Sequence, residues 1–84
     1  MTRYVLPVEI EPLEEGGYLA TCPLLQGCHA QGETIAEAIE NVQDVAKVLL
    51  EIYAQDRKPI PSELQKVKPD TVLHNEIMVT ADSR

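Results

Sequence analysis

The sequence predicts an α+β fold in which three antiparallel strands, one helix and a final strand follow one another along the chain. Three observations support this class: apolar and polar residues alternate over Tyr4–Glu11, glycine-containing turns divide Glu14–Gly32, and an amphipathic stretch runs from Ile35 to about Ala54. The 84 residues allow one small domain that spans residues 1–84. Its core must be aliphatic, because the only aromatic side chains are three tyrosines.

The first strand is expected over Tyr4–Glu11, which reads YVLPVEIE. Alternate residues form an apolar face, and Glu9 and Glu11 share the opposite face. Pro7 has no backbone N–H for a neighbouring strand, so its amide position is expected at an edge or a bulge.

Two turns follow the first strand and produce a three-stranded meander. The pair Gly16–Gly17 supplies positive φ angles at low cost, which favours a hairpin connection to a return strand over Tyr18–Cys22. A second turn over Pro23–Gly27 leads to a short third strand, Cys28–Gln31, which Gly32 closes.

The clearest element is a helix from Ile35 to about Ala54. Thr34 is followed three residues later by Glu37, which is the pattern of a capping box. Leu50 falls outside the main apolar stripe, and we interpret it as part of a second partner surface. The stripe residues recur at helical spacing and are Ile35, Ala38, Ile39, Val42, Val45, Ala46, Leu49, Ile52 and Tyr53.

Prolines end the helix, and a last strand follows. Pro59 and Pro61 forbid a helical continuation, and Ser62–Pro69 is polar and has no clear pattern. A last strand is expected near Glu76–Thr80, paired beside the first strand. The predicted fold is therefore β-β-β-α-β, with one mainly antiparallel sheet and the helix packed on one of its faces.

The charge balance constrains the partners. The formal net charge is −7, which argues against non-specific nucleic-acid binding and is consistent with a basic partner or simply with a solvated acidic surface. No apolar run is long enough for a membrane span, and the N-terminus does not have the pattern of a signal peptide. We therefore expect a cytoplasmic protein with reduced cysteines and no membrane association.

The two cysteines do not have the spacing of a metal site. Zinc needs four ligands, and only His29 and His74 could join Cys22 and Cys28, at spacings that do not fit. Cys28 and His29 are neighbours on a strand and point to opposite faces, which argues against a catalytic dyad. A Cys22–His29 pair across the hairpin stays open as an alternative. Buried structural cysteines are favoured, and we expect no metal or cofactor.

Glu9 and Glu11 raise the alternative of a metal-dependent nuclease. Two carboxylates on one strand face could hold Mg²⁺, but such a site needs further acids from other elements. Glu37 and Glu40 are expected on the exposed side of the helix, and Glu76 has no clear placement. A solvated strand face is favoured, and neither glycine-containing turn has the pattern of a phosphate-binding loop.

The stretch EEGGYLATCPLLQGCHAQGETIAEAIENVQ resembles the HicB-like antitoxin family. An acid-Gly-Gly-Tyr segment, a Cys-Pro pair, a Gly-Cys pair, a Gly-Glu-Thr segment and a helical Glu-Ala-aliphatic-Glu-Asn segment agree in order and spacing. The resemblance covers about residues 4–54. The matching residues are Gly16, Gly17, Tyr18, Cys22, Pro23, Gly27, Cys28, Gly32, Thr34, Glu37 and Asn41.

The resemblance implies a degenerate RNase H-like fold without catalytic residues, and binding to a HicA-type toxin, a small basic mRNA-cleaving enzyme. An acidic face with Glu9, Glu11, Glu14 and Glu15 is the candidate toxin-binding surface. Many such antitoxins continue into a DNA-binding domain, and this chain ends at Arg84. We therefore expect no direct DNA binding from this chain alone. The alternative function is an orphan RNase H-like protein with metal-dependent nuclease activity.

Self-association is the last expectation from the sequence. A short domain gains stability by association, and an apolar last strand needs cover. We expect a homodimer or homotetramer with contacts from Thr71–Thr80 and from the C-terminal half of the helix.

Overall fold

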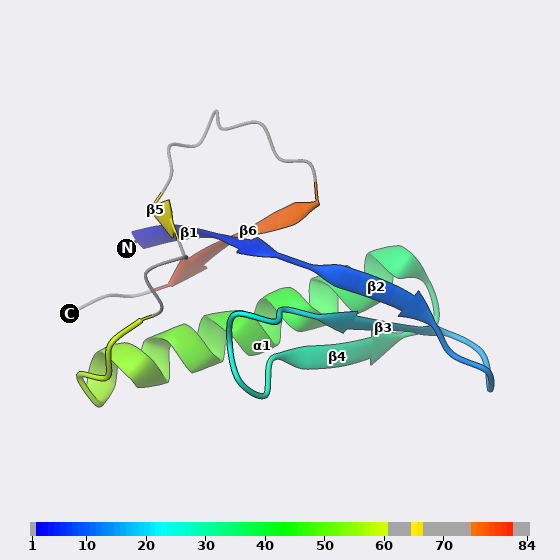
Figure 1. Ribbon diagram of the computed structural model, residues 1–84, viewed down its shortest axis with the longest axis horizontal. Helices are drawn as coiled ribbons and strands as arrows, with labels where there is room; N and C mark the ends of the chain where they lie inside the picture. The colour runs from blue at the N-terminus through cyan, green and yellow to red at the C-terminus, as the bar shows by residue number, and fades with distance from the viewer. Residues whose placement is uncertain (1, 61–64, 67–74, 82–84) are drawn as a thin grey trace.

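The computed structural model describes residues 2–60, 65–66 and 75–81. Parts of the expected segments Ser62–Pro69 and Thr71–Thr80 lie outside the described residues, and so does His74. One helix and antiparallel strands confirm the α+β class (Figure 1). The elements are, in order, β1 (Thr2–Pro7), β2 (Glu9–Pro12), β3 (Tyr18–Thr21), β4 (His29–Gly32), α1 (Ile35–Gln55), β5 (Gln65–Lys66) and β6 (Glu76–Ala81).

The described strands form two three-stranded sheets, so the single sheet predicted from the sequence is wrong. The β1 sheet has the order β5-β1-β6, and the β3 sheet has the order β2-β3-β4. The expected first strand is divided at Val8, whose N–H donates to the Asn75 carbonyl at 3.0 Å. β1 pairs with β6 as far as Pro7, and the bond from Val8 to Asn75 continues that register by one residue. From Glu9 onward the chain pairs with β3 instead. The RNase H-like arrangement stays a prediction.

The last strand pairs beside the first, as the sequence predicts. β6 runs antiparallel to β1 from Thr2↔Ala81 to Pro7↔Glu76. On its other side, β1 pairs with the two-residue strand β5 at Tyr4↔Lys66 and Val5↔Gln65. A strand of two residues in a polar segment has no detectable periodicity, which is why the sequence did not predict β5.

The three-stranded meander is confirmed. β2 pairs with β3 and β3 with β4, both antiparallel. Three turn glycines adopt positive φ, at +104° for Gly16, +83° for Gly17 and +78° for Gly27. Glycine adopts these angles without the penalty that a side chain would impose, so the turn residues direct the chain back along the sheet.

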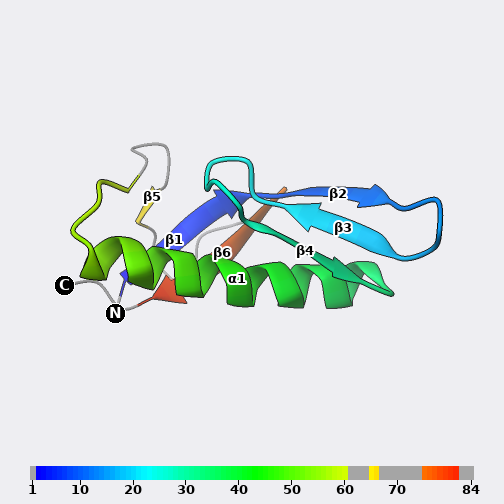
Figure 2. The same cartoon turned by 90° about the horizontal axis from the view of Figure 1, so that it is seen from below.

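The capping box at the start of α1 is present with one change of partner. The Thr34 hydroxyl accepts a hydrogen bond from the Glu37 N–H at 3.0 Å. The Glu37 carboxylate accepts one from the N–H of Glu33 at 2.9 Å, rather than from Thr34 itself. The first bond satisfies a backbone donor that the first helical turn leaves free, and the second ties the residue before the cap to that turn. The helix then runs along both sheets, its N-terminal half beside the β3 sheet and its C-terminal half beside the β1 sheet (Figure 2).

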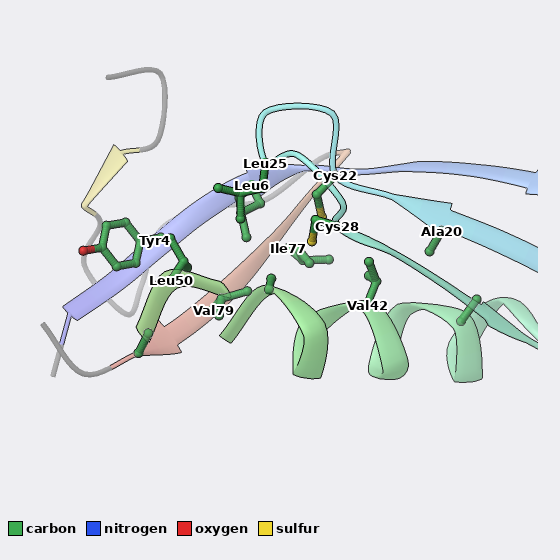
Figure 3. Packing of buried hydrophobic residues seen from close by; sticks show 13 residues of the cluster. Tyr4, Leu6, Ala20, Cys22, Leu25, Cys28, Val42, Leu50, Ile77 and Val79 are labelled. Carbon is green, nitrogen blue, oxygen red and sulfur yellow. The ribbon is translucent and has the colours of Figure 1, made fainter. Parts of the chain in front are cut away.

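The core lies between α1 and the two sheets (Figure 3). The buried face of the helix is the set Ala38, Val42, Ala46 and Leu50, spaced four residues apart. The interpretation of Leu50 as a partner surface is wrong, because this side chain is only 1% exposed. Steps of four residues drift slowly around a helix, so the buried stripe moves to a new side of α1 as the helix passes from one sheet to the other.

Candidate functional site

The outward face of β2 carries two carboxylates. Glu9 and Glu11 are exposed, and Ile10 between them packs against the core from the opposite face. In the register of the sheet, Glu9 lies opposite Thr21 and Glu11 opposite Leu19. No strand of the described part of the chain pairs with the outer edge of β2. The two acids therefore face away from α1 on a sheet edge that a partner can reach.

The turn after β2 adds two further carboxylates. The Leu13 N–H donates to the Gly17 carbonyl at 2.9 Å, and the Gly16 N–H donates to the Leu13 carbonyl at 3.0 Å. These bonds close a tight turn whose tip presents the exposed side chains of Glu14 and Glu15. One hairpin thus carries all four acids that the sequence selected.

An open groove lies between this turn and the start of α1. Its volume is about 520 Å³. Three carboxylate side chains, those of Glu15, Glu33 and Glu37, are among its lining residues. Of these three residues, only Glu15 is predicted from the sequence at a partner surface; Glu37 is predicted as part of the helix cap, and Glu33 has no predicted role. The strand register is the signal that identifies this groove. A meander with Tyr18 opposite Gly32 brings the turn and the helix start to the same end of the sheet.

Close backbone packing holds the groove together. A Cβ atom at Gly17 would lie 2.8 Å from the Gly32 carbonyl oxygen, a distance that real Cβ contacts essentially never show. The Asn41 side-chain amide donates to the Gln31 carbonyl at 2.8 Å and so ties β4 to α1. These contacts give Gly17 and Asn41 a structural role, because they fix the hairpin to the helix.

The structure does not gather the four selected acids into one pocket. Glu15 lines the groove, whereas Glu9 and Glu11 lie on the outward face of the sheet. Within residues 2–60, 65–66 and 75–81, no group of three or more His, Cys, Asp or Glu side chains is placed to hold a metal ion. The described geometry therefore presents these acids as an extended charged surface.

The two cysteines lie next to each other in the core, and the His29 side chain does not join them there. Cys22 and Cys28 are 0% and 2% exposed, and the Cys22 N–H donates to the Cys28 carbonyl at 2.9 Å. His29 is exposed and lies opposite Thr21 in the β3–β4 register. The expectation of buried cysteines is confirmed, and the alternative Cys22–His29 pair is wrong because the two side chains lie on opposite faces.

No helix in the described residues combines the length and apolar character that a membrane crossing requires.

Several known proteins are similar in sequence to this chain. The UPF0150 protein ssr1765 of Synechocystis sp. is 40% identical over 70 residues, which cover 83% of this chain and 89% of that protein. Antitoxin HicB of Escherichia coli K12 is 37% identical over 60 residues, or 69% of this chain and 44% of that protein. Antitoxin HicB 1 of Photorhabdus laumondii is 40% identical over 55 residues, or 66% of this chain and 36% of that protein.

A family match extends the similarity beyond the hairpin and the helix. Residues 6–82 match the description "HicB_like antitoxin of bacterial toxin-antitoxin system". This range includes the acidic hairpin, the groove, α1 and β6. The chain belongs to the HicB-like antitoxin family of bacterial toxin–antitoxin systems.

Proposed function

We propose that this antitoxin-family protein, a single HicB-like domain, binds and neutralises a small basic toxin of the HicA type. The family match over residues 6–82 is the observation that carries the proposal. The net charge of −7 suits a basic partner, since opposite charges raise the association rate. Such a toxin acts on mRNA, so the proposed encounter takes place in the cytoplasm.

The acidic hairpin is the proposed toxin-docking surface. Glu9 and Glu11 lie on the exposed edge of β2, and Glu14 and Glu15 lie at its turn. A single exposed ion pair contributes about 0–1 kcal/mol, so several carboxylates must act together. The hairpin can present them in a fixed arrangement, because its turn packs against the backbone at Gly32.

The binding test compares two charge reversals of equal size. We expect Glu9→Lys/Glu11→Lys to weaken binding of a purified HicA-type toxin by about tenfold or more, which corresponds to about 1.4 kcal/mol. The matched control Glu40→Lys/Asp44→Lys makes the same change on the exposed face of α1 and should have a much smaller effect. Calorimetry at low and at moderate salt measures both constants.

Three results would contradict the proposal. Equal weakening in both double variants would show that only the total charge matters and would remove the hairpin as the docking surface. No binding by the wild-type protein would overturn the toxin proposal itself. Cleavage of RNA or an RNA–DNA hybrid in Mg²⁺ or Mn²⁺ that is lost in Glu9→Gln would favour the nuclease alternative.

We also propose that the protein forms a homodimer or homotetramer through the C-terminal half of α1. Val48 and Ile52 are 55% and 41% exposed, and the partly buried Val45 and Leu49 lie beside them at spacings of three and four residues. Association would remove this apolar strip from water, which favours self-assembly.

Light scattering after size exclusion tests the assembly at micromolar concentration. We expect a multiple of 9.3 kDa for the wild-type chain and a shift toward the monomer for Val48→Asp/Ile52→Asp. The control Lys47→Asp changes an exposed residue outside the apolar strip and should leave the mass unchanged. A wild-type monomer would refute the proposal.

A further inference from the structure

Two thiols face each other at the end of the β3–β4 hairpin. The last ladder pair is Thr21↔His29, and Cys22 and Cys28 are the next residues in the same register. Their backbones are joined by the 2.9 Å hydrogen bond from the Cys22 N–H to the Cys28 carbonyl. The two sulfur atoms point toward each other within the core (Figure 3), and the side chains are joined by a hydrogen bond between the thiols.

This placement meets the geometric requirement for a disulfide. Residues directly opposite each other in an antiparallel pair have Cα atoms about 4.5–5.5 Å apart. Disulfides span Cα separations of about 4.4–6.8 Å and require converging Cβ atoms. Because the two sulfur atoms already face each other (Figure 3), a bond between them does not require β3 and β4 to move apart. Both cysteines are reduced in the described structure.

We propose that Cys22 and Cys28 form a reversible oxidation site, at which a low-molecular-weight disulfide such as oxidised glutathione converts the two thiols into one intramolecular disulfide. Neither thiol has another role in the proposed toxin-binding surface. The site therefore adds a covalent modification to the protein, independent of how the toxin docks.

The reaction is balanced by thiol–disulfide exchange. The Cys28 thiolate attacks one sulfur of oxidised glutathione, forms a mixed disulfide and releases one glutathione thiolate. The Cys22 thiolate then attacks the Cys28 sulfur, forms the internal disulfide and releases the second glutathione. Two protein thiols are oxidised, one glutathione disulfide is reduced to two thiols, and the two protons from the protein pass to the departing glutathione.

The order of the two steps follows from the contact between the thiols. The hydrogen bond from Cys22 lowers the pKa of the Cys28 thiol, because it stabilises the Cys28 thiolate. The same hydrogen bond, together with burial, raises the pKa of the Cys22 thiol. Cys28 therefore loses its proton first and is the attacking sulfur, while Cys22 resolves the mixed disulfide.

The turn between the cysteines controls access to them. Leu25 is buried in this turn, and its backbone joins both cysteines through the Leu25 N–H to the Cys22 carbonyl at 3.2 Å and the Cys28 N–H to the Leu25 carbonyl at 3.1 Å. Reagent must enter through local opening of this turn. Leu25→Ala should therefore accelerate oxidation several-fold, whereas Leu24→Ala, at a partly buried neighbour, should accelerate it less.

The experiment measures oxidation of the native chain. Purified protein is incubated with excess oxidised glutathione without denaturant, quenched with acid, unfolded and alkylated with N-ethylmaleimide. We expect a single chain that has lost two hydrogens and takes up no alkylating reagent. Its melting temperature should rise by several degrees, because a cross-link restricts the unfolded chain, and dithiothreitol should reverse both changes.

Three outcomes would overturn the proposal. Two alkylated thiols per chain after oxidant treatment would show that the pair does not react. A stable glutathione adduct on the wild-type chain would show that the second step fails. Disulfide-linked dimers would assign the thiols to contacts between chains. Cys22→Ser supplies the mechanistic control, since it should stop at the mixed disulfide on Cys28, and failure to form that adduct would contradict Cys28 as the attacking sulfur.

Discussion

Gly32→Ala should lower the free energy of unfolding more than any other single change proposed, because the new methyl group would collide with the backbone of α1. A Cβ atom at Gly32 would lie 2.7 Å from the Glu37 carbonyl carbon and 2.8 Å from the Ala38 Cα, and it would also overlap the Ala38 nitrogen. All three are backbone atoms, so no flexible side chain can move aside. Overpacking costs about 1–3 kcal/mol even where side chains relax, so we expect a loss of about 3 kcal/mol or more.

Urea unfolding followed by circular dichroism measures this loss, and Gly16→Ala is the matched control. A Cβ at Gly16 meets no atom within 4 Å, but the φ of +104° strains any L-residue. The control should therefore lose about 1–2 kcal/mol through backbone strain alone. Equal losses in the two variants would mean that the hairpin does not pack against α1 as described. The position of the groove beside this contact would then also be wrong.

Leu50→Ala should have the second largest effect. Leu50 is 1% exposed and is one of the largest fully buried side chains of the core. Truncating such a leucine removes buried apolar surface and leaves a cavity, which costs about 2–5 kcal/mol. The total stability of a domain is about 5–15 kcal/mol, so this single change removes a large part of it.

Val48→Ala is the control for Leu50→Ala. Both residues are on the C-terminal half of α1, but Val48 is 55% exposed. The free energy of unfolding of the monomer should change by about 0.5 kcal/mol or less in this variant. Urea melts at low protein concentration, where association is minimal, separate the two effects. If Val48→Ala were the more damaging change, the side of α1 that carries Leu50 would not be the buried one.

Local signals in the sequence predicted the meander and the helix. The Thr34–Glu37 spacing located the helix start, because the capping bonds join residues within one helical turn. The glycine turns located the hairpins for the same reason, since positive φ at Gly16 is a property of that residue and its neighbours. The pairing of β6 with β1 could also be inferred, because one sheet edge was free for it.

The candidate site was only partly predictable. Glu9, Glu11, Glu14 and Glu15 could be selected from one hairpin, because alternation along a strand and the position of a turn are local properties. Glu33 was missed, since its approach to Glu15 depends on the register between β3 and β4 and on the packing of the turn against the helix. The direct contact of Cys22 with Cys28 depends on the same register.

The sequence by itself determined the order and type of the main elements, the turn positions and the family motif. Only the tertiary structure decided where the first strand divides, that Leu50 belongs to the buried face of α1, and which side chains meet in the groove. The first strand divides at Val8, whose N–H still donates to Asn75, far along the chain, before Glu9 pairs with Thr21 of β3. Leu50 is buried because the helix passes from one sheet to the other. Both outcomes depend on contacts between distant segments, whereas sequence patterns report only the preferences of residues a few positions apart.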